Sequence, residues 1–542
     1  MTINLMIFSE PGTLQNLTVF YNFKWQDLRG MLVKTFGCAV HGIHGMTVTV
    51  EVNVSRGIRF FLVGLPDNAV RESQHRIESA FRSTGFKWPG KQITINLAPA
   101  DVRKEGSAYD LTLAVGILAA SEQIAAEGLE RYMIMGELSL DGGLQPVRGA
   151  LPIALRARED GFSGIILPRA NAREAAVVQE LEVLGANSLR EVVDHLTGRK
   201  PLTPIHVDLD EVFAARANRY ALDFADVRGQ ESVKRALEVA AAGGHNVIMI
   251  GSPGAGKTML AKRLPTILPP LTLEEAIETT KVHSVAGKRS DDTPLVTQRP
   301  FRSPHHTISD VALVGGGTYP QPGEISLAHN GVLFLDELPE FKRSVLEVLR
   351  QPLEERVITI SRARFTVEYP ANFMLVAAMN PCPCGYYNHP TKSCVCTPGM
   401  IQKYLHKISG PLLDRIDIHI EVIPVEFEKL AASRPAESSE QIRERVVRAR
   451  RLQAERFASF PGIYSNSQMN RKMIERFCPV DSAGRHLLQN AIERRGLSAR
   501  AYDRILKVAR TIADLEGETD ILNHHLAEAI QYRSLDREGW AG

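Results

Sequence analysis

A glycine-rich loop lies between an apolar segment, 246–250, and a helical pattern that starts at Met259 in the 542-residue sequence. Glycines let consecutive backbone N–H groups face phosphate oxygens, and the N-terminus of the following helix adds partial positive charge. The lysine of such a P-loop reaches the β and γ phosphates, and its Ser or Thr hydroxyl binds Mg²⁺. The sequence therefore predicts an ATP site built from Gly251, Ser252, Pro253, Gly254, Ala255, Gly256, Lys257 and Thr258.

Two adjacent carboxylates, Asp336 and Glu337, follow a second apolar segment at 332–335. We expect Asp336 to hold Mg²⁺ through water and Glu337 to polarise the attacking water as a general base. Acidic pairs also end strands that have no catalytic role. The P-loop upstream favours the catalytic interpretation, which predicts ATP hydrolysis with Mg²⁺ as a cofactor.

Three further residues are candidates for the same reaction. Asn380 ends the apolar segment 373–379, where AAA+ ATPases place the polar sensor that orients the water. Arg415 follows it and is expected to reach the γ-phosphate of the neighbouring subunit, where it would stabilise developing charge. For a lone arginine the alternative is a surface salt bridge. Arg500 is a similar candidate near the end of the chain, with Arg504 one helical turn later as the alternative.

Four of the six cysteines lie close together, and they are Cys382, Cys384, Cys394 and Cys396. Four thiolates are the complement of a closed structural Zn²⁺ site, although the usual spacing is Cys-x-x-Cys. Free buried thiols are the alternative, and His389 could replace one thiolate. We predict a structural Zn²⁺ that staples a loop starting two residues after Asn380. For the adjacent His305 and His306, hydrogen bonding within a loop is favoured over metal binding.

Two longer strings add to these motifs: Arg-Pro-Phe-Arg-Ser-Pro-His-His-Thr at 299–307 and Asn-Pro-Cys-Pro-Cys-Gly at 380–385. With them, the chain from Met31 to about Leu535 resembles the ComM/YifB proteins, Mg-chelatase-like AAA+ ATPases of bacteria. The resemblance implies a homo-hexameric ring similar to the MCM helicases and the magnesium-chelatase motor subunit. It also implies a DNA helicase that drives branch migration during natural transformation, with single-stranded or branched DNA as the partner.

The N-terminal part resembles the proteolytic domain of Lon but departs from it at the catalytic residues. The Lon motif Lys-Asp-Gly-Pro-Ser-Ala-Gly corresponds to Lys-Glu-Gly-Ser-Ala-Tyr-Asp at 104–110. This alignment puts Ala108 at the nucleophile and Ser107 one position away, and Leu151 stands where Lon has its activating lysine. A serine without its base is a weak nucleophile, so we expect a non-proteolytic scaffold or a DNA-binding collar.

Two segments are candidates for contacting DNA in the pore of a ring. The insertion 284–324 carries Arg302, and the hairpin-like segment 357–367 carries Arg362 and Arg364 at its turn. Basic side chains at such positions can contact phosphates regardless of base sequence. A solvated hairpin tip is the alternative.

The order of apolar and helical patterns predicts an α/β protein of several domains, because a chain of 542 residues is too long for one core. Met31 is expected to be the native start. We predict an extension at 1–30, a Lon-protease-like α/β domain at 31–198, a linker at 199–222, an AAA+ P-loop α/β domain at 223–425 and a C-terminal helical lid at 426–542.

Composition limits the class of protein and the cellular location that can be expected. Hydrophobic residues make up 44% and charged residues 23% of the chain, which is typical of globular proteins. No apolar run reaches the roughly 20 residues that span a bilayer, and no secretory signal pattern is present. We therefore expect a cytoplasmic protein without membrane contact. The net charge is only +2, so DNA contacts must come from locally placed Lys and Arg.

Three classes of function fit an ATP-driven ring: a DNA translocase, a Mg-chelatase-like ATPase that remodels a protein partner, and an ATP-dependent protease. Ala108 and Leu151 argue against the protease. The Lon-like domain and the cysteine cluster are, by resemblance, features of ComM/YifB proteins rather than of the chelatase subunit. The DNA translocase is the favoured hypothesis.

Overall fold

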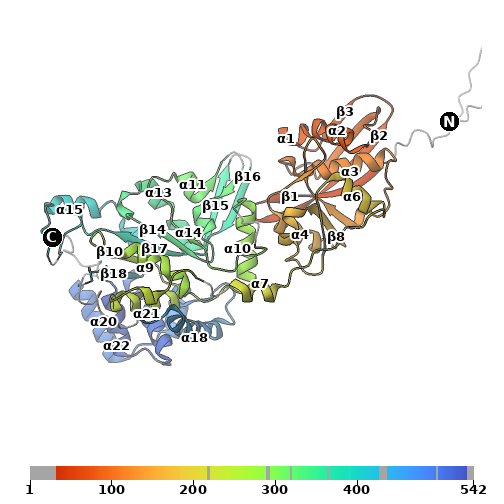
Figure 1. Cartoon of the computed structure of the whole chain (residues 1–542). Helices are drawn as coiled ribbons and strands as arrows, with labels where there is room; N and C mark the ends of the chain where they lie inside the picture. The colour runs from red at the N-terminus through yellow and green to blue at the C-terminus, as the bar shows by residue number, and fades with distance from the viewer. Residues whose placement is uncertain are drawn as a thin grey trace, which may run out of the picture.

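The computed structural model describes residues 32–533, except for 217–219, 289–292, 318–319, 363–364, 390, 426–435 and 496–498. The predicted N-terminal extension, 1–30, lies outside the described residues. The described chain forms two α/β bodies side by side, and a helical region packs against the second body (Figure 1). No described helix is both long enough and apolar enough to cross a lipid bilayer.

A seven-stranded sheet in the order β3-β4-β2-β1-β5-β8-β9 forms the N-terminal body. Strands β1 and β2 pair as a long antiparallel hairpin, and buried side chains alternate with less buried ones along β2. This alternation is expected of a strand that turns one face to a core. The bounds are β1 Leu32–His41, β2 His44–Ser55, β3 Phe60–Val63, β4 Gln92–Ala98, β5 Tyr132–Ile134, β8 Gly164–Pro168 and β9 Glu182–Ala186, with a separate two-stranded pair β6 Glu137–Leu138 and β7 Leu144–Gln145.

Helices connect and cover these strands, and α3 is buried at every residue, which explains why most of its side chains are apolar. Helices α1 and α2 are separated only by Glu72, where α1 ends and α2 begins. The bounds are α1 Asn68–Arg71, α2 Ser73–Thr84, α3 Asp110–Ala120, α4 Ala150–Glu159, α5 Arg169–Ala175 and α6 Leu189–Leu196.

The second body is a five-stranded parallel sheet in the order β11-β14-β17-β10-β18. Its central strands are buried along their whole length, which explains their uninterrupted apolar sequences. Because the carboxyl ends of parallel strands meet at one edge, the segments that follow β10, β14 and β17 converge there. The bounds are β10 Val247–Gly251, β11 Phe301–Arg302, β14 Val332–Leu335, β17 Met374–Met379 and β18 Ile418–Val422.

Helices and short strands surround this sheet. The hairpin predicted around 357–367 is confirmed, since β15 Val357–Arg362 pairs antiparallel with β16 Phe365–Pro370. A shorter pair joins β12 Gly315–Gly316 to β13 Gln321–Pro322. The helices are α8 Glu231–Gly243, α9 Lys257–Arg263, α10 Leu273–Val285, α11 Asp310–Val314, α12 Glu324–Leu327, α13 Arg343–Glu347, α14 Arg350–Glu355, α15 Pro398–Leu405 and α16 Gly410–Leu413.

The C-terminal region is helical, as predicted. Helices α18 and α21 pack against α8, and their buried side chains join one hydrophobic core with β10 and β18. This region therefore shares a core with the P-loop sheet instead of forming an independent body. The helices are α18 Ser439–Phe457, α19 Arg471–Phe477, α20 Ser482–Arg495, α21 Ala499–Glu516 and α22 Asn523–Gln531.

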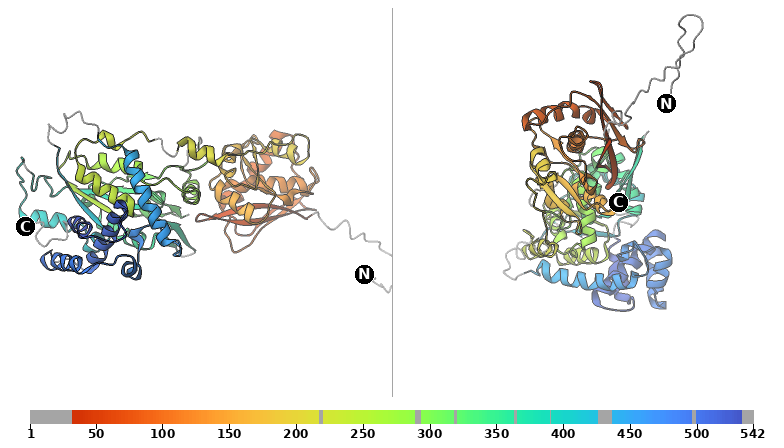
Figure 2. Two further views of the ribbon diagram at one scale, coloured as in Figure 1. Left: turned by 90° about the horizontal axis from the view of Figure 1, so that it is seen from below. Right: turned by 90° about the vertical axis from the view of Figure 1, so that its right-hand side faces the viewer.

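The stretch predicted as a linker, 199–222, contains regular secondary structure. Helix α7, Leu209–Arg216, lies within it (Figure 2). Upstream of α7, the Ile205 N–H donates to the Val183 carbonyl on edge strand β9, and Leu202 packs against the N-terminal core. The segment thus satisfies backbone groups that an edge strand would otherwise leave unpaired.

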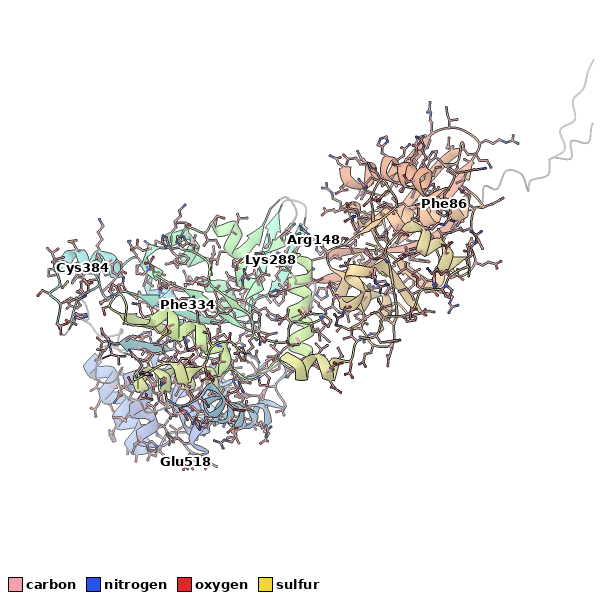
Figure 3. The ribbon with its side chains drawn as sticks, viewed as in Figure 1. Phe86, Arg148, Lys288, Phe334, Cys384 and Glu518 are labelled. Atoms are coloured by element: carbon pink, nitrogen blue, oxygen red, sulfur yellow. The ribbon has the colours of Figure 1, made fainter. Side chains whose placement is uncertain are left out.

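The two bodies touch at the tip of the β1–β2 hairpin and around α4 and α10. The tip of the β1–β2 hairpin inserts Ile43, which is 5% exposed, into the hydrophobic cluster that contains Val367 of β16. The Gly149 N–H, at the start of α4, donates to the Ser284 carbonyl of α10 over 3.4 Å. Arg148 and Lys288 mark this second contact in Figure 3. Both segments predicted to face a pore therefore touch the N-terminal domain.

Candidate active site

The P-loop joins the end of β10 to the start of α9. Gly254 and Gly256 have φ angles of 81° and 92°, in the left-handed region that glycine adopts most readily. The Lys257 Nζ donates to the carbonyls of Gly251 and Ser252 at 2.7 and 3.1 Å and to Asn380 Oδ1 at 3.1 Å. Burial lowers the pKa of Lys257, while the nearby acidic groups counteract this shift. The predicted lysine and the predicted sensor asparagine are thus in direct contact.

The acidic motif lies beside this lysine. Thr258 Oγ1 donates to Asp336 Oδ2 over 2.6 Å, the arrangement expected when a hydroxyl and a carboxylate share one Mg²⁺. Glu337 has a φ of 53°, a left-handed conformation that is uncommon for a non-glycine residue and is found at functional sites. The structure therefore brings together Lys257, Thr258, Asp336, Glu337 and Asn380.

His306 also reaches this group, which the sequence did not indicate. Its Nδ1 lies 3.2 Å from Glu337 Oε2. The expectation of hydrogen bonding within the loop holds for His305, whose Nδ1 lies 2.9 Å from Thr307 Oγ1. His306 instead connects the insertion 284–324 to the predicted general base.

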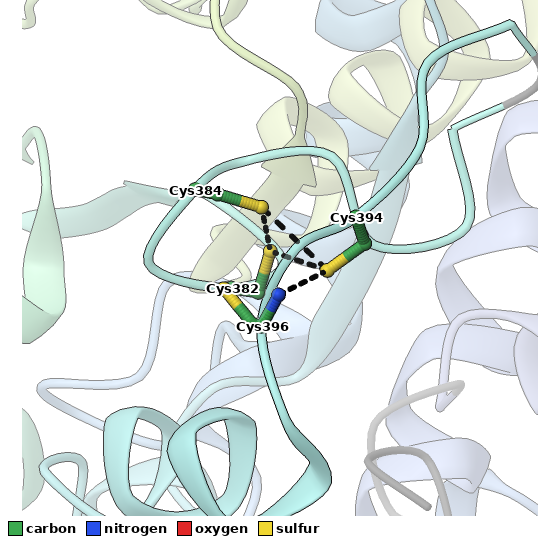
Figure 4. A group of neighbouring side chains, drawn as sticks. All are labelled: Cys382, Cys384, Cys394 and Cys396. Atoms are coloured by element: carbon green, nitrogen blue, oxygen red, sulfur yellow. Dashed lines mark hydrogen bonds between the residues drawn. The ribbon is translucent and has the colours of Figure 1, made fainter.

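The four clustered cysteines converge after β17 (Figure 4). The Sγ atom of Cys382 lies 3.3 Å from that of Cys384 and 3.7 Å from that of Cys394, and Cys384 and Cys394 are 3.5 Å apart. A tetrahedral Zn²⁺ with Zn–S bonds of about 2.3 Å requires sulfur–sulfur distances of about 3.8 Å. The four thiols therefore fit the predicted Zn²⁺ site.

His389 does not join this cluster. Its Nδ1 accepts hydrogen bonds from the Thr391 and Lys392 N–H groups, both at 3.1 Å. The alternative in which His389 replaces a thiolate is not supported, because the four sulfur atoms already lie within 4.8 Å of one another.

The cysteine loop packs directly on the P-loop. A Cβ added to Gly385 would lie 2.5 Å from Pro253 Cδ, which is too close for any side chain. The same loop contributes 387–389 to a cavity of about 200 Å³, whose other walls are the ends of β10 (250–252) and β18 (421–424). The predicted zinc loop thus forms one wall of a cavity beside the P-loop.

Arg415 is buried at 8% exposure within its own subunit. Its guanidinium donates to the Glu354 carboxylate and to the Pro411 carbonyl. The Glu354 side chain is 60% exposed, so this partner lies at the surface. Arg415 must exchange Glu354 for a phosphate if it acts on a neighbouring subunit, and its role there remains a prediction.

The lid arginines contact the segment that carries Arg415. Arg500 Nη1 donates to Asp414 Oδ2 over 3.0 Å, and Arg504 donates to Asp417. Asp417 Oδ2 also lies 3.1 Å from Nδ1 of His245, which follows helix α8. The structure therefore places Arg500 beside the Arg415 segment of its own chain, and its catalytic role remains a prediction.

The candidate DNA contacts differ in their surroundings. Arg302 forms a bidentate ion pair with Glu324, in which Nε donates to Oε2 over 2.6 Å and Nη2 donates to Oε1 over 2.8 Å. Arg362 is the last residue of β15, and Arg364 lies outside the described residues. Contact with DNA remains a prediction for all three arginines.

The Lon-like site shows why proteolysis is not expected. Ser107 Oγ donates to a Glu137 carboxylate oxygen, and Leu151 is fully buried in α4. The Lys104 ammonium donates to the Leu97 and Pro99 carbonyls. Ser107 therefore faces a carboxylate, and the position of the Lon lysine holds an apolar side chain in the core.

Comparison with known proteins agrees with this arrangement. Models of magnesium chelatase subunit ChlI match residues 50–171 and 223–430, and the ChlI C-terminal model matches residues 436–533. The chain is 46% identical to "Competence protein ComM" of Haemophilus influenzae over 512 residues, which cover 93% of this chain and 98% of that protein. The chain belongs to the ComM/YifB family of magnesium-chelatase-like AAA+ ATPases.

Two further relatives match nearly the whole chain and a part of it, respectively. YifB of Escherichia coli is 44% identical over 504 residues, or 92% of this chain and 96% of that protein. Lon protease 2 of Bacillus subtilis is 30% identical over 144 residues, or 26% of this chain and 25% of that protein. ComM/YifB membership confirms the predicted AAA+ fold and an ATPase that uses ATP and Mg²⁺.

Proposed function

We propose that this ComM/YifB ATPase is an ATP-driven DNA motor that assembles as a homo-hexamer and promotes branch migration during homologous recombination in natural transformation. Its similarity along 93% of its length to a protein named for competence carries the proposal. The proposed reaction is the one that the resemblance to ComM/YifB proteins implies. ATP hydrolysis at the P-loop would provide its energy.

Each residue of the site would have its own role in ATP hydrolysis. Lys257, which now bonds to backbone carbonyls and Asn380, would move to the β and γ phosphates. Thr258 and Asp336 would hold Mg²⁺, which neutralises charge on the phosphate oxygens when bound. Glu337 would accept a proton from the attacking water that Asn380 orients.

In a ring, the neighbouring subunit would complete each ATP site. A finger arginine supplied by the neighbour stabilises transition-state charge, and we assign this role to Arg415 with Arg500 beside it. The four cysteines would hold a structural Zn²⁺ that keeps the loop against Pro253. The hairpin β15–β16 and the insertion 284–324 would contact the DNA backbone.

A second function, remodelling of a protein partner, is favoured by the matches to a magnesium chelatase subunit. The two functions differ in what stimulates hydrolysis. ATPase activity measured with and without single-stranded and branched DNA, beside a branch-migration assay, tests the proposal. Stimulation by DNA and migration of a branched substrate are expected. An ATPase indifferent to DNA that also fails to bind it would favour the protein-remodelling function.

A further inference from the structure

The tip of the β1–β2 hairpin packs against strand β16 of the ATPase body (Figure 1). Ile43 is buried there in the same hydrophobic cluster as Val367. The His41 Nε2 lies 3.4 Å from the Thr366 carbonyl oxygen. A Cβ added to Gly42 would lie 3.1 Å from Val367 Cγ1, so the turn of one hairpin lies directly on the other. Three consecutive residues of the N-terminal domain therefore make this contact.

The contact lies close to the part of the β15–β16 hairpin where DNA binding is predicted. Val367 pairs with Ile360 and Thr366 with Ser361, and the next pair along the hairpin contains Arg362. A two-stranded hairpin is marginally stable by itself, so its position depends on what its buried face packs against. The N-terminal tip therefore supports the hairpin immediately beside the pair that contains Arg362.

The N-terminal domain also holds the other candidate DNA segment. Leu295, in the insertion 284–324, is 1% exposed and belongs to the hydrophobic core of the N-terminal domain. The hairpin and the insertion contact each other as well, because the Tyr369 hydroxyl donates to the Pro320 carbonyl over 2.7 Å. The N-terminal domain, the hairpin and the insertion are therefore packed together as one unit.

Such packing affects DNA affinity without any contact to DNA. When the binding-competent arrangement of a site is populated only part of the time, the apparent Kd rises by the inverse of that fraction. Arginines on a hairpin that moves must first be brought into position before they meet the phosphates. A buried apolar contact that fixes the hairpin raises the competent fraction and lowers the cost of binding.

We infer that the tip of the β1–β2 hairpin is the support of the β15–β16 hairpin, and that Ile43 is the positioning residue that keeps this hairpin in its DNA-binding arrangement. The support follows from the packing alone, whereas its effect on DNA affinity rests on the proposed function. The N-terminal domain thereby sets the DNA affinity of the ATPase body from a distance.

Hydrogen exchange tests the support in the full chain without DNA. In Ile43→Ala, the amides of 357–362 and 365–370 should exchange about tenfold faster than in wild type, because the loss of a buried side chain makes local opening of the hairpin easier. The amides of β10 and β17 should exchange at wild-type rates. Ile43→Leu keeps the buried volume and should restore slow exchange.

DNA binding tests the positioning role. Ile43→Ala should raise the Kd for single-stranded DNA about tenfold, because the competent fraction falls. The salt dependence of binding should keep its wild-type slope, since the candidate arginines of the hairpin still meet the phosphates, whereas loss of a direct phosphate contact lowers that slope. Ile43→Leu should recover the affinity. Met46→Ala is the matched control, because Met46 lies on the same hairpin but is 40% exposed, and it should bind DNA as wild type does.

The outcomes separate this inference from the proposed function. Unchanged exchange in Ile43→Ala, or faster exchange that extends to β10 and β17, overturns the support. Faster exchange confined to the hairpin together with an unchanged Kd, or with a shallower salt slope, overturns the positioning role. Faster exchange confined to the hairpin in a protein whose wild type does not bind DNA upholds the support and overturns the DNA motor.

Discussion

The Arg504 guanidinium of the lid donates a hydrogen bond to the Asp417 carboxylate, two residues beyond Arg415. Asp417 is fully enclosed and also faces His245, which follows α8. Burial alone would raise the pKa of Asp417, but Arg504 and His245 hold it well below its ordinary value. Lid helix α21, helix α8 and the Arg415 segment are therefore joined through one carboxylate.

Asp417→Ala should destabilise the protein strongly. Removing one partner of a buried ion pair leaves Arg504 and His245 uncompensated and costs about 3–5 kcal/mol. Asp414→Ala is the matched control, because Arg500 is 69% exposed and a surface pair contributes less than about 1 kcal/mol. Denaturant unfolding measures both.

The same pair predicts a pH dependence. A carboxylate with a lowered folded-state pKa stabilises the fold above its unfolded pKa of about 3.9, and this contribution is lost as the pH falls further. The gap in unfolding free energy between wild type and Asp417→Ala should therefore be full at pH 7 and shrink below about pH 4. An equal gap at pH 7 and pH 3 would contradict the ion pair.

Lys257→Ala and Glu337→Gln should separate binding from hydrolysis. Lys257→Ala removes the cation that meets the phosphates, so fluorescent-nucleotide binding should be lost. Glu337→Gln keeps that cation and should bind ATP while kcat falls about 10²- to 10⁴-fold. Equal nucleotide affinity in wild type and Lys257→Ala would rule out the assignment.

Arg415→Ala should leave ATP binding nearly intact and reduce kcat by about 10³-fold or more. Mixing it with Glu337→Gln subunits tests action in trans. A Glu337 from the first variant can then meet an Arg415 from the second, and part of the activity should return. Mixed rings, verified by mass, that recover nothing at any ratio would argue that Arg415 acts elsewhere.

Purified protein should contain about one Zn²⁺ per chain. Cys384→Ser with Cys394→Ser should lose the metal and weaken ATP binding, because the loop that contacts Pro253 is then unsupported. Cys478→Ala, which alters a buried thiol elsewhere, should keep both properties. Protein purified without chelator in reducing buffer that contains no zinc would disprove the site.

Arg362→Ala with Arg364→Ala should spare basal ATPase and abolish DNA stimulation and branch migration. Phosphate contacts release counterions, so the salt dependence of DNA binding should become shallower by about one to two contacts. Arg448→Ala with Arg451→Ala removes two exposed arginines from α18 and serves as the control. Undiminished branch migration by the hairpin variant would exclude this hairpin as the DNA contact.

The sequence predicted those parts of the site that lie at strand ends. Lys257, Asp336 and Asn380 follow three apolar segments, and parallel pairing alone brings such positions together. His306 and Glu337 meet because an insertion folds back, which no local pattern encodes. The Arg415–Glu354 pair and the structured linker arise likewise from packing between distant segments.

The position of Ile43 in the core of the ATPase body has a consequence for dissecting the molecule. A truncated chain that begins after residue 198 would uncover the apolar wall around Val367, and Leu295, buried in the N-terminal core, would lose its partners. Such a fragment would expose an apolar, aggregation-prone surface beside both candidate pore segments. Point changes at the junction, such as Ile43→Ala, are therefore a cleaner way to learn what the N-terminal domain contributes than its removal.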